Sequence, residues 1–455
     1  MLAAAQAKIV SKSQSFYGWK LVGVLWLLDF LNMGLPLYCG AVINTYMLKQ
    51  IPMERSVYGL GFTLLNLFVG LPSTVVAAAI LRWSIRTTFV IGSALILVGT
   101  LWLSFFATRP WHYLVGFGVI IATGISFGTL VPVTTAVTRW FHRYRGRAMA
   151  IPLGASGFAG FVGAPLINKI LAANGGNWRQ AWLIIAGIMI VSAVIAILFV
   201  RERPEDLGQA VDGVPAAPAM GTGPNRNTSS ASQSAAELGA KFTWTPSQVY
   251  RKPSYWLIVL GGVACQFPFF FFTAHWILHL RQHGIAPADA AWAMGLFTMG
   301  GIGGRLVGGW LMDVLTPRFA FMSGLCCYFV GSLLAMHVDT GGLPLAIAAA
   351  ILYGVGFGWT FICMNTVTSR YYGPLVFPKI NGMLLLLTGV LGSPAGVIGG
   401  KLFDRFGNYT PAFELNILVA ALGIFGLAFA HAPTLRAGPD TVSIDATRAP
   451  EPAVP

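Results

Sequence analysis

The sequence has few charged residues. Charged side chains make up 10% of the 455 residues, far below the roughly 25% usual for soluble domains. Hydrophobic residues reach 56%, and they gather in runs long enough to cross a bilayer as helices. These figures exclude an ordinary soluble domain. They predict an all-α polytopic membrane protein.

Cysteine and histidine are also scarce. The seven histidines are scattered, and the cysteines are odd in number with no metal-type spacing: Cys39, Cys265, Cys326, Cys327 and Cys363. A disulfide framework and a zinc site are therefore not expected. The glycine-rich stretches fall inside apolar runs, without the strand context of a nucleotide-binding loop. We expect no enzyme, no metal and no cofactor.

Twelve apolar stretches are each about the 20 residues that a crossing helix needs. Their approximate limits are 19–47, 57–81, 88–107, 113–138, 147–172, 182–200, 256–280, 288–312, 319–337, 343–367, 380–403 and 412–430. The first run is too long for a signal-peptide core. Twelve transmembrane helices are therefore predicted.

Basic residues are unequally divided between the loops. Twenty of the 29 fall on the side of the chain ends, eight fall on the other side, and Arg305 lies within the membrane. Because cytoplasmic loops carry the excess of Lys and Arg, both termini are predicted to be cytoplasmic, in a cell inner (plasma) membrane. The net charge of +14 follows from this distribution and gives no reason to expect nucleic-acid binding.

The chain repeats itself at an offset of about 231 residues. GISFG from Gly124 corresponds to GVGFG from Gly354, and GNWRQAW holds Asn177 where GNYTPAF holds Asn408. LRWSIR, which ends at Arg86, corresponds to DVLTPR, which ends at Arg318. The repeat predicts two pseudo-symmetric six-helix halves, residues 1–200 and 252–432. Between them, 201–251 is rich in Ala, Gly, Pro, Ser and Thr and is predicted to be a flexible cytoplasmic linker. Residues 433–455 are a cytoplasmic tail.

Arg305 stands alone in an apolar, glycine-rich helix. Unpaired in lipid, its charge would cost several kcal/mol, so it must face protein or water. Gly300, Gly301, Gly303 and Gly304 leave room for a small anion beside the guanidinium. We predict that Arg305 binds a carboxylate, and the alternative is a structural buried pair.

Asp29 is the other charge deep in a membrane helix. Straight-helix counting at about 1.5 Å per residue places it at a depth similar to that of Arg305. In one interpretation Asp29 pairs with Arg305, gives up this partner to the substrate and takes up a proton. In the other it forms a hydrogen bond to a neighbouring helix and moves no proton. We assign it, with Arg305, to proton coupling.

Several stretches resemble a known family. They are YGWK at Tyr17, WFHRYRGRAMAIPLGASGFAG at Trp140, RPEDLG at Arg203, GGRLVGGWLMD around Arg305 and KLFDRFGNYTPAF at Lys401. Over nearly its whole length the chain resembles a major facilitator superfamily transporter, and within that superfamily the monocarboxylate transporter and oxalate:formate antiporter family. The resemblance implies the major facilitator fold.

The resemblance also implies roles for single residues. Arg305 would pair with the substrate carboxylate, and His275 corresponds to a histidine of lactate-type carriers. Spans one, seven and ten would line the cavity, which adds Asn32, Tyr353 and Trp359, although such residues can also merely pack. Thr388, a polar residue of span eleven, completes the candidate binding residues. The superfamily's loop signature survives in altered form, so Arg82, Arg86, Asp313 and Arg318 would act in gating. The first copy has lost its aspartate, which leaves that copy's role open.

Span eleven lacks the lysine of the dicarboxylate carriers, so the resemblance favours a monocarboxylate. We predict a secondary transporter that moves a small organic monocarboxylate, such as lactate or pyruvate, with a proton by alternating access. The alternatives are an organic-anion antiporter of the oxalate:formate type and a carboxylate sensor that transports nothing. The expected partners are this substrate, protons and the bilayer, with no nucleic acid, and the chain is expected to be monomeric.

Overall fold

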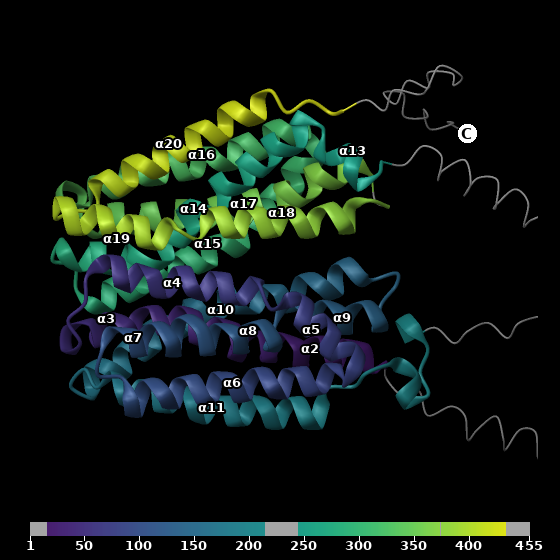
Figure 1. Ribbon diagram of the computed structural model, residues 1–455, viewed down its shortest axis with the longest axis horizontal. Helices are drawn as coiled ribbons and strands as arrows, with labels where there is room; N and C mark the ends of the chain where they lie inside the picture. Colours follow the sequence, from purple (N-terminus) through teal and green to yellow (C-terminus); the bar gives the residue numbers. More distant parts are fainter. Residues whose placement is uncertain (1–15, 214–243, 374, 434–455) are drawn as a thin grey trace, which may run out of the picture.

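The computed structural model describes residues 16–213, 244–373 and 375–433, and within these ranges the regular structure is helical with no strand. The helices form two side-by-side bundles, purple to blue for the first part of the chain and teal to yellow for the second (Figure 1). The centre of the predicted linker and nearly all of the tail lie outside the described residues. This arrangement confirms the predicted all-α fold of two six-helix halves.

The first half begins with one bent crossing. It joins α2 (Tyr17–Asp29), the π-helical η1 (Phe30–Cys39), which contains Pro36, and α3 (Gly40–Gln50). The remaining helices are α4 (Arg55–Gly70), α5 (Ser73–Arg82), α6 (Ile85–Phe106), α7 (Pro110–Tyr113), η2 (Leu114–Ile121), α8 (Ala122–Gly128), α9 (Leu130–Trp140), α10 (Arg145–Ala173) and α11 (Trp178–Phe199). The predicted second span is interrupted at Leu71 and Pro72, because proline cannot continue the hydrogen-bond ladder.

The second half follows a short helix, α13 (Pro246–Tyr250). Its crossings are α14 (Pro253–Gln282), α15 (Pro287–Val314), α16 (Pro317–Met336), α17 (Val338–Tyr372), α18 (Phe377–Gly392), α19 (Ala395–Phe406) and α20 (Thr410–Ala428). Proline stands at the first position of α14, α15 and α16, where its missing N–H costs nothing. Ser393 and Pro394 interrupt the predicted eleventh span.

Eleven stretches of the described residues are long and apolar enough to cross a membrane. The predicted span at 288–312, helix α15, is not among them, because Arg305 and its many glycines lower its mean hydropathy. It nevertheless runs for 28 residues. It packs against α17 of its own half and α10 of the other, so it lies at the interface between the halves.

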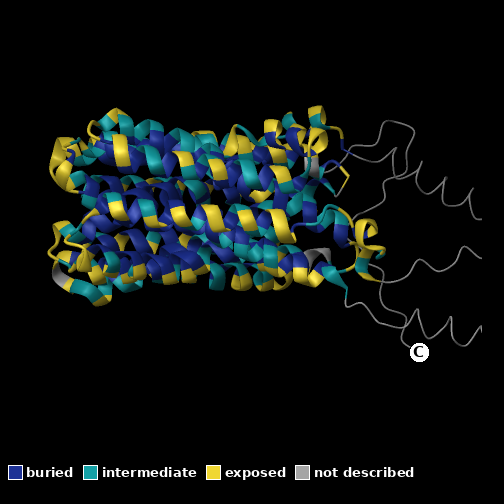
Figure 2. Ribbon diagram, turned by 90° about the horizontal axis from the view of Figure 1, so that it is seen from below, coloured by how far each residue is buried: buried dark blue, intermediate teal, exposed yellow. Residues whose placement is uncertain are grey.

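The outward faces of the bundles carry large exposed hydrophobic side chains such as Phe105, Trp310 and Phe425. Figure 2 shows the exposed positions along the outer faces and ends, with buried residues filling the interior over the whole length. This is the distribution expected of a bundle whose outside meets lipid. The chain is a multi-pass membrane protein.

The sequence repeat is also a structural repeat. Near the start of α6, Arg86 donates from Nε and Nη2 to the Val200 carbonyl at 3.1 and 2.9 Å. Near the start of α16, Arg318 donates from Nη1 to the Ala428 carbonyl at 3.2 Å. Each arginine thus ties the third crossing of its half to the end of the sixth.

The paired asparagines behave alike. The Asn177 side chain accepts from the Gln180 N–H at 3.2 Å, and Asn408 accepts from the Thr410 N–H at 3.0 Å. Each one satisfies a backbone donor at the start of the last crossing of its half. The offset read from the sequence therefore marks equivalent positions.

The start of the predicted linker is ordered. Two short 3₁₀ helices, η3 (Pro204–Leu207) and η4 (Val211–Gly213), follow α11. Glu202 binds Arg139, and Asp212 accepts from the backbone N–H groups of His142 and Arg143. The predicted flexible linker therefore begins with a regular segment, residues 201–213, whose acidic side chains bind to the loops of the first half.

Candidate functional site

A small cavity lies between the halves, midway along α15. Its volume is about 20 Å³, enough for roughly one water molecule. Its lining comes from both halves: Tyr38, Ser156 and Gly157 from the first, and Phe269, Phe297, Thr298, Gly301, Ile302, Arg305, Gly354 and Phe357 from the second. The structure thus shows a small site between the halves, with one cation in its lining.

Arg305 points across the interface. Its Nη1 donates to the Leu153 carbonyl of α10 at 2.7 Å, and the side chain lines the cavity. One of its five N–H donors is therefore used by the other half, and the guanidinium lies against protein. This is the position that the cost of an unpaired charge in lipid demands.

Small residues let the helices meet at this point. A Cβ added to Gly304 would overlap the Val355 carbonyl, and one added to Gly301 would lie 3.6 Å from the Gly354 carbonyl. The glycine-rich face of α15 therefore packs against α17 at backbone distance, while Arg305 lies toward α10. Glycines here serve helix packing more than anion access.

Asp29 belongs to the same neighbourhood. Its residue is 1% exposed, and its Oδ2 has no hydrogen-bond partner among the described residues. The backbone N–H and hydroxyl of Ser156 face the carboxylate, and Arg305 lies close enough to interact with it electrostatically. Ser156 lines the cavity, so a single residue separates the acid from the site.

His275 lies elsewhere. Its Nε2 is 2.7 Å from the Gly396 carbonyl and its Nδ1 is 3.2 Å from the Tyr409 hydroxyl. Because a carbonyl can only accept, Nε2 carries the proton. Both ring nitrogens are partnered, and His275 is absent from the lining of the Arg305 cavity. It contributes to the contact between α14 and α19 instead.

The four other predicted binding residues lie in the cores of the halves. Asn32 donates to the Gly128 carbonyl and accepts from Ser93 and Ser192 at 3.2 and 2.8 Å. The three others make hydrogen bonds within the second half: Tyr353 with Ser332 at 2.6 Å, Trp359 to the Ala320 carbonyl at 2.8 Å and Thr388 to the Leu385 carbonyl at 3.3 Å. None of the four lines the cavity; they satisfy buried polar groups.

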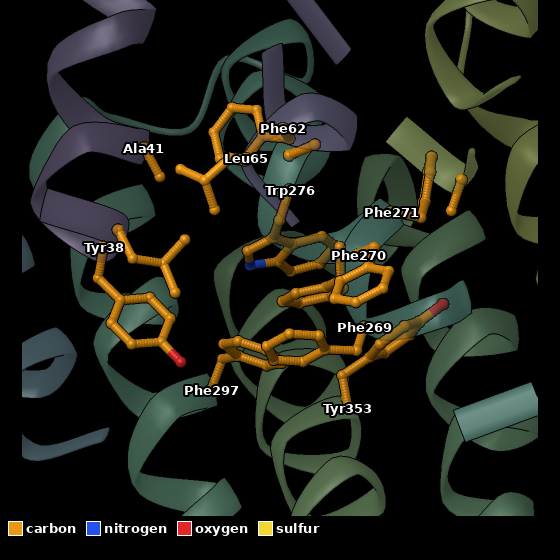
Figure 3. Close-up of a cluster of buried hydrophobic side chains, with 14 of the residues drawn as sticks. Tyr38, Ala41, Phe62, Leu65, Phe269, Phe270, Phe271, Trp276, Phe297 and Tyr353 are labelled. Carbon is orange, nitrogen blue, oxygen red and sulfur yellow. The ribbon is translucent and has the colours of Figure 1, made fainter. Parts of the chain in front are cut away.

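Aromatic residues form one wall of the cavity. The rings of Phe269 and Phe357 stack with centroids 3.8 Å apart, and Phe297 lies 5.8 Å from Phe269. Figure 3 shows Tyr38 of the first half beside Phe297 of the second. Thus an apolar wall and a tyrosine hydroxyl share the cavity with the guanidinium.

One signal would have found part of this lining. Thr298, Gly301, Ile302 and Arg305 stand at the i, i+3, i+4 and i+7 positions of one helix face. Extending that period back from Arg305 identifies three neighbours. The lining from η1, α10, α14 and α17 depends on helix rotation and could not be obtained this way.

The predicted gating residues act within their own halves. Arg86 and Arg318 bind helix-end carbonyls, and Asp313 accepts from Arg370 Nη2 at 2.9 Å. Arg82 is exposed at the end of α5. Within the described residues, the hydrogen bonds and ion pair of these side chains stay inside their own half.

The halves meet closely at the end of the bundle far from the described chain ends. Asp404, which follows the glycine-rich part of α19, accepts from the N–H groups of Arg55 and Ser56 at 2.9 Å each. It thereby caps α4 of the other half, an interaction typically worth about 1 kcal/mol. Thr63 also donates to the Ser393 carbonyl at 2.7 Å.

Glycines make this contact possible. A Cβ on Gly59 would overlap the Gly396 carbonyl, and one on Gly400 would overlap the Arg55 carbonyl. The backbones of α4 and α19 therefore touch without intervening side chains. We call this contact the α4–α19 seal, formed by Gly59, Thr63, Gly396, Gly400 and Asp404.

No group of three or more His, Cys, Asp or Glu that could hold a metal ion occurs in the part of the chain that the structure describes. The site offers a cation, a buried acid and an aromatic wall, and no nucleophile with a base. Such a constellation suits the binding of an anion rather than covalent chemistry.

A duplicated helical bundle with a polar site at its internal interface defines the class of membrane transporters. The Major Facilitator Superfamily model matches residues 24–377, and the chain belongs to that family. It is therefore a transporter and not an enzyme.

The relatives point the same way. Human monocarboxylate transporter 11 is 26% identical over 377 residues, covering 78% of this chain and 70% of the relative. A gallate transporter of Pseudomonas putida is 25% identical over 352 residues, and the match covers 72% of this chain and 72% of the relative. Among solved structures, the nucleoside transporter NupG has a TM-score of 0.65 at 14% identity, with 90% of this chain and 99% of NupG covered.

A D-xylose–proton symporter has a TM-score of 0.64 at 13% identity and covers 90% of this chain and 97% of its own. At such low identity these two structures show the fold alone. They confirm the major facilitator fold expected from the sequence.

Proposed function

We propose that the chain carries a small organic monocarboxylate across the membrane together with a proton. The observation that carries this proposal is Arg305, a guanidinium in a cavity between the halves, where each half supplies part of the lining. An arginine presents a planar fork of donors that fits a carboxylate with two hydrogen bonds. Monocarboxylate and gallate transporters among the relatives support this substrate class.

The site as it stands is too small for such a substrate. A volume of about 20 Å³ holds little more than a water, so the substrate must enter when the halves separate at one end. Arg305 then releases the Leu153 carbonyl and takes the carboxylate. Rocking of the two halves around a central site is the alternating-access motion of duplicated transporters.

Asp29 is the proposed proton carrier. It is buried one residue behind the cavity and interacts with Arg305 electrostatically. When an anionic substrate takes over the guanidinium, the unpaired Asp29 carboxylate becomes costly in its buried position. Proton uptake by Asp29 relieves that cost and links the two fluxes.

The protein is proposed to act as a monomer in the cell inner (plasma) membrane, with both termini in the cytoplasm. The excess of basic residues on the loops at the termini side supports this orientation. The α4–α19 seal then lies at the outer end, and the conformation described here is closed to the outside.

Purified protein in proteoliposomes tests the function. Labelled lactate should accumulate when the outside is acidified, and the uptake should saturate. Arg305→Lys keeps the charge but loses the fork, so kcat/KM should fall about tenfold to a hundredfold, as expected for a lost charged hydrogen bond. Arg405→Lys, an exposed exchange at the far end, serves as the control.

Near-normal kinetics of Arg305→Lys would contradict the assigned role. Uptake that needs internal oxalate or formate and ignores the pH gradient would show an antiporter. Binding of lactate without any uptake would show a sensor.

A further inference from the structure

A second, larger cavity opens at the end of the bundle that carries the α4–α19 seal. Its volume is about 320 Å³, which reaches the range of roughly 300–1,000 Å³ typical of small-molecule sites. Helices of both halves line it, through Thr45, Leu48, Lys49, Arg55, Leu278, Arg281, Gln282 and Phe403. It lies away from the Arg305 cavity and shares no lining residue with it.

The lining is positively charged. Three of its eight residues are cations, Lys49 and Arg55 from the first half and Arg281 from the second, and none is acidic. Lys49 and Arg281 are close enough to interact electrostatically as like charges. Bringing these cations together across the interface costs free energy unless an anion lies between them.

One donor in this cluster is unused. Nη1 of Arg55 is shielded from solvent and has no hydrogen-bond partner among the described residues, although its ring-facing guanidinium lies 5.3 Å from the Phe403 centroid. Arg55 as a residue is only partly buried and lines the cavity, so its guanidinium adds a third positive charge to that lining. Gln282, by contrast, is committed to the Gly407 carbonyl at 2.8 Å.

The nearby acids do not neutralise the cavity. Asp404 directs both carboxylate oxygens at the backbone N–H groups of Arg55 and Ser56, at 2.9 Å each. Glu54 accepts from the Ser56 hydroxyl at 3.1 Å. Both lie on the α4 side of the cavity and outside its lining, so an excess of positive charge remains at Lys49 and Arg281.

We propose that this cavity is a second anion-binding site, which holds a small organic carboxylate beside the seal before the transporter opens to that side. The identity of the anion rests on the proposed function. Lys49, Arg55 and Arg281 supply donors from three helices, and Leu48, Leu278 and Phe403 supply an apolar floor for the carbon skeleton. The positive lining raises the local concentration of an anionic substrate beside the seal.

Initial rates with substrate on the sealed side test the proposal. For Lys49→Gln and Arg281→Gln, KM should rise about threefold to fivefold each at low ionic strength, with kcat unchanged. The reason is that a charge at the entrance of a site changes how fast the substrate associates and not the later steps. The difference should shrink at high salt, because salt screens the charges. Substrate added on the other side should show no change.

Lys169→Gln is the matched control. Lys169 is exposed at the same end on α10, outside the cavity, so its loss changes the net charge equally. An equal rise in KM for Lys169→Gln would reduce the effect to general surface charge and overturn the proposal. A fall in kcat with KM unchanged would also overturn it.

A binding measurement separates this proposal from the proposed function. Thermal unfolding of detergent-purified Arg305→Lys protein is followed against lactate and, separately, sodium sulfate at constant ionic strength. Stabilisation that persists in Arg305→Lys and disappears when Lys49→Gln and Arg281→Gln are added supports the second site, whether or not lactate is transported. Stabilisation that survives those two substitutions would overturn it.

Discussion

The two halves match closely at their loops and differ in the membrane. At the loops, each half ties its third crossing to the end of its sixth, through Arg86 and Val200 or through Arg318 and Ala428. In the membrane, the offset of 232 residues that relates Arg86 to Arg318 places Ser73 opposite Arg305. The cation belongs to one half and the buried acid, Asp29, to the other.

The loops also differ in one respect. In the second half, Arg370 pairs with Asp313, and the two side chains are 42% and 77% exposed. In the first half, Leu81 stands at the position equivalent to Asp313, and Arg139 pairs instead with Glu202. Duplication thus preserved an arginine while its acidic partner came from another part of the chain.

Glu202 does more than replace the lost aspartate. One oxygen accepts from the Arg86 N–H at 3.0 Å and the other binds Arg139 at 2.9 Å. It therefore joins the third, fourth and sixth crossings, and its ion pair is only about one quarter exposed. The equivalent loops of the second half depend on a more exposed pair.

The largest expected effect tests the separation of the two membrane charges, Asp29 in the first half and Arg305 in the second. Asp29→Asn should abolish accumulation of lactate driven by a pH gradient, which amounts to roughly a tenfold loss per pH unit of gradient. Lactate–lactate exchange, which needs no net proton movement, should persist. Both are measured in proteoliposomes, and proton-driven accumulation by Asp29→Asn would contradict its role.

The next effect tests the loop partners. Glu202→Ala leaves Arg139 and the Arg86 N–H without their acceptor, so it should destabilise the protein by about 1–2 kcal/mol. Thermal unfolding in detergent should show a midpoint lower by about 2–6 °C. Glu205→Ala, an exposed exchange nearby, should leave the midpoint unchanged.

Leu81→Asp in the Glu202→Ala background sharpens the comparison. If the halves are equivalent, an acid at position 81 should pair with Arg139 as Asp313 pairs with Arg370 and recover part of the lost stability. No recovery would show that the two loops have diverged beyond exchange of one residue.

Asp313→Ala should have a smaller effect. Its pair with Arg370 is exposed, and exposed ion pairs contribute about 0–1 kcal/mol. Arg370 also keeps its hydrogen bond to the Met312 carbonyl at 2.6 Å. The midpoint of thermal unfolding should therefore fall by less than with Glu202→Ala. An equal fall would mean that the greater exposure of the Arg370–Asp313 pair does not make it weaker than the Arg139–Glu202 pair.

The smallest effect concerns Asp212, which has a positive φ of 61° and binds the loop after α9. Burial raises the pKa of its carboxyl, but hydrogen bonds from the backbone N–H groups of Arg143 and His142 outweigh this and lower the pKa. The contribution to stability is therefore present at neutral pH and lost only as pH falls through this lowered pKa.

Hydrogen exchange measures the contribution of the Asp212 carboxylate to local stability. The protection factors of the His142 and Arg143 amides should be constant from pH 7 to about pH 5. Asp212→Asn should reduce them about twofold to fivefold. A decline of protection in the wild-type protein already between pH 7 and pH 5 would contradict a lowered pKa.

Much of the fold could be predicted because hydropathy and duplication are properties of the sequence itself. The repeat offset identified Arg86 and Arg318 as equivalent, and the structure places them in equivalent contacts. The cost of burying charge likewise predicted that Arg305 would lie against protein. The binding roles assigned to Asn32 and Tyr353 remain predictions: in this conformation both side chains bond to buried partners and lie outside the lining of the cavity.

Helix rotation explains those differences. A span fixes the depth of a residue but not the direction of its side chain, so His275 and Trp359 could be placed in the membrane but not around the cavity. The sequence also did not show which charged residues would pair through tertiary contacts. Nothing in RERPEDLG distinguishes Glu202, which binds two arginines, from Glu205, which is exposed.

The α4–α19 seal has a consequence for how the protein switches. Its faces at Gly59, Gly396 and Gly400 carry no side chains, so parting them requires no rotamer change and breaks no interlocked packing. Polar contacts cross the seal at two places, where the N–H groups of Arg55 and Ser56 donate to Asp404 and where Thr63 donates to the Ser393 carbonyl. Separation of the two faces therefore costs chiefly these few hydrogen bonds and the close backbone contact, and water can satisfy the polar groups that become exposed.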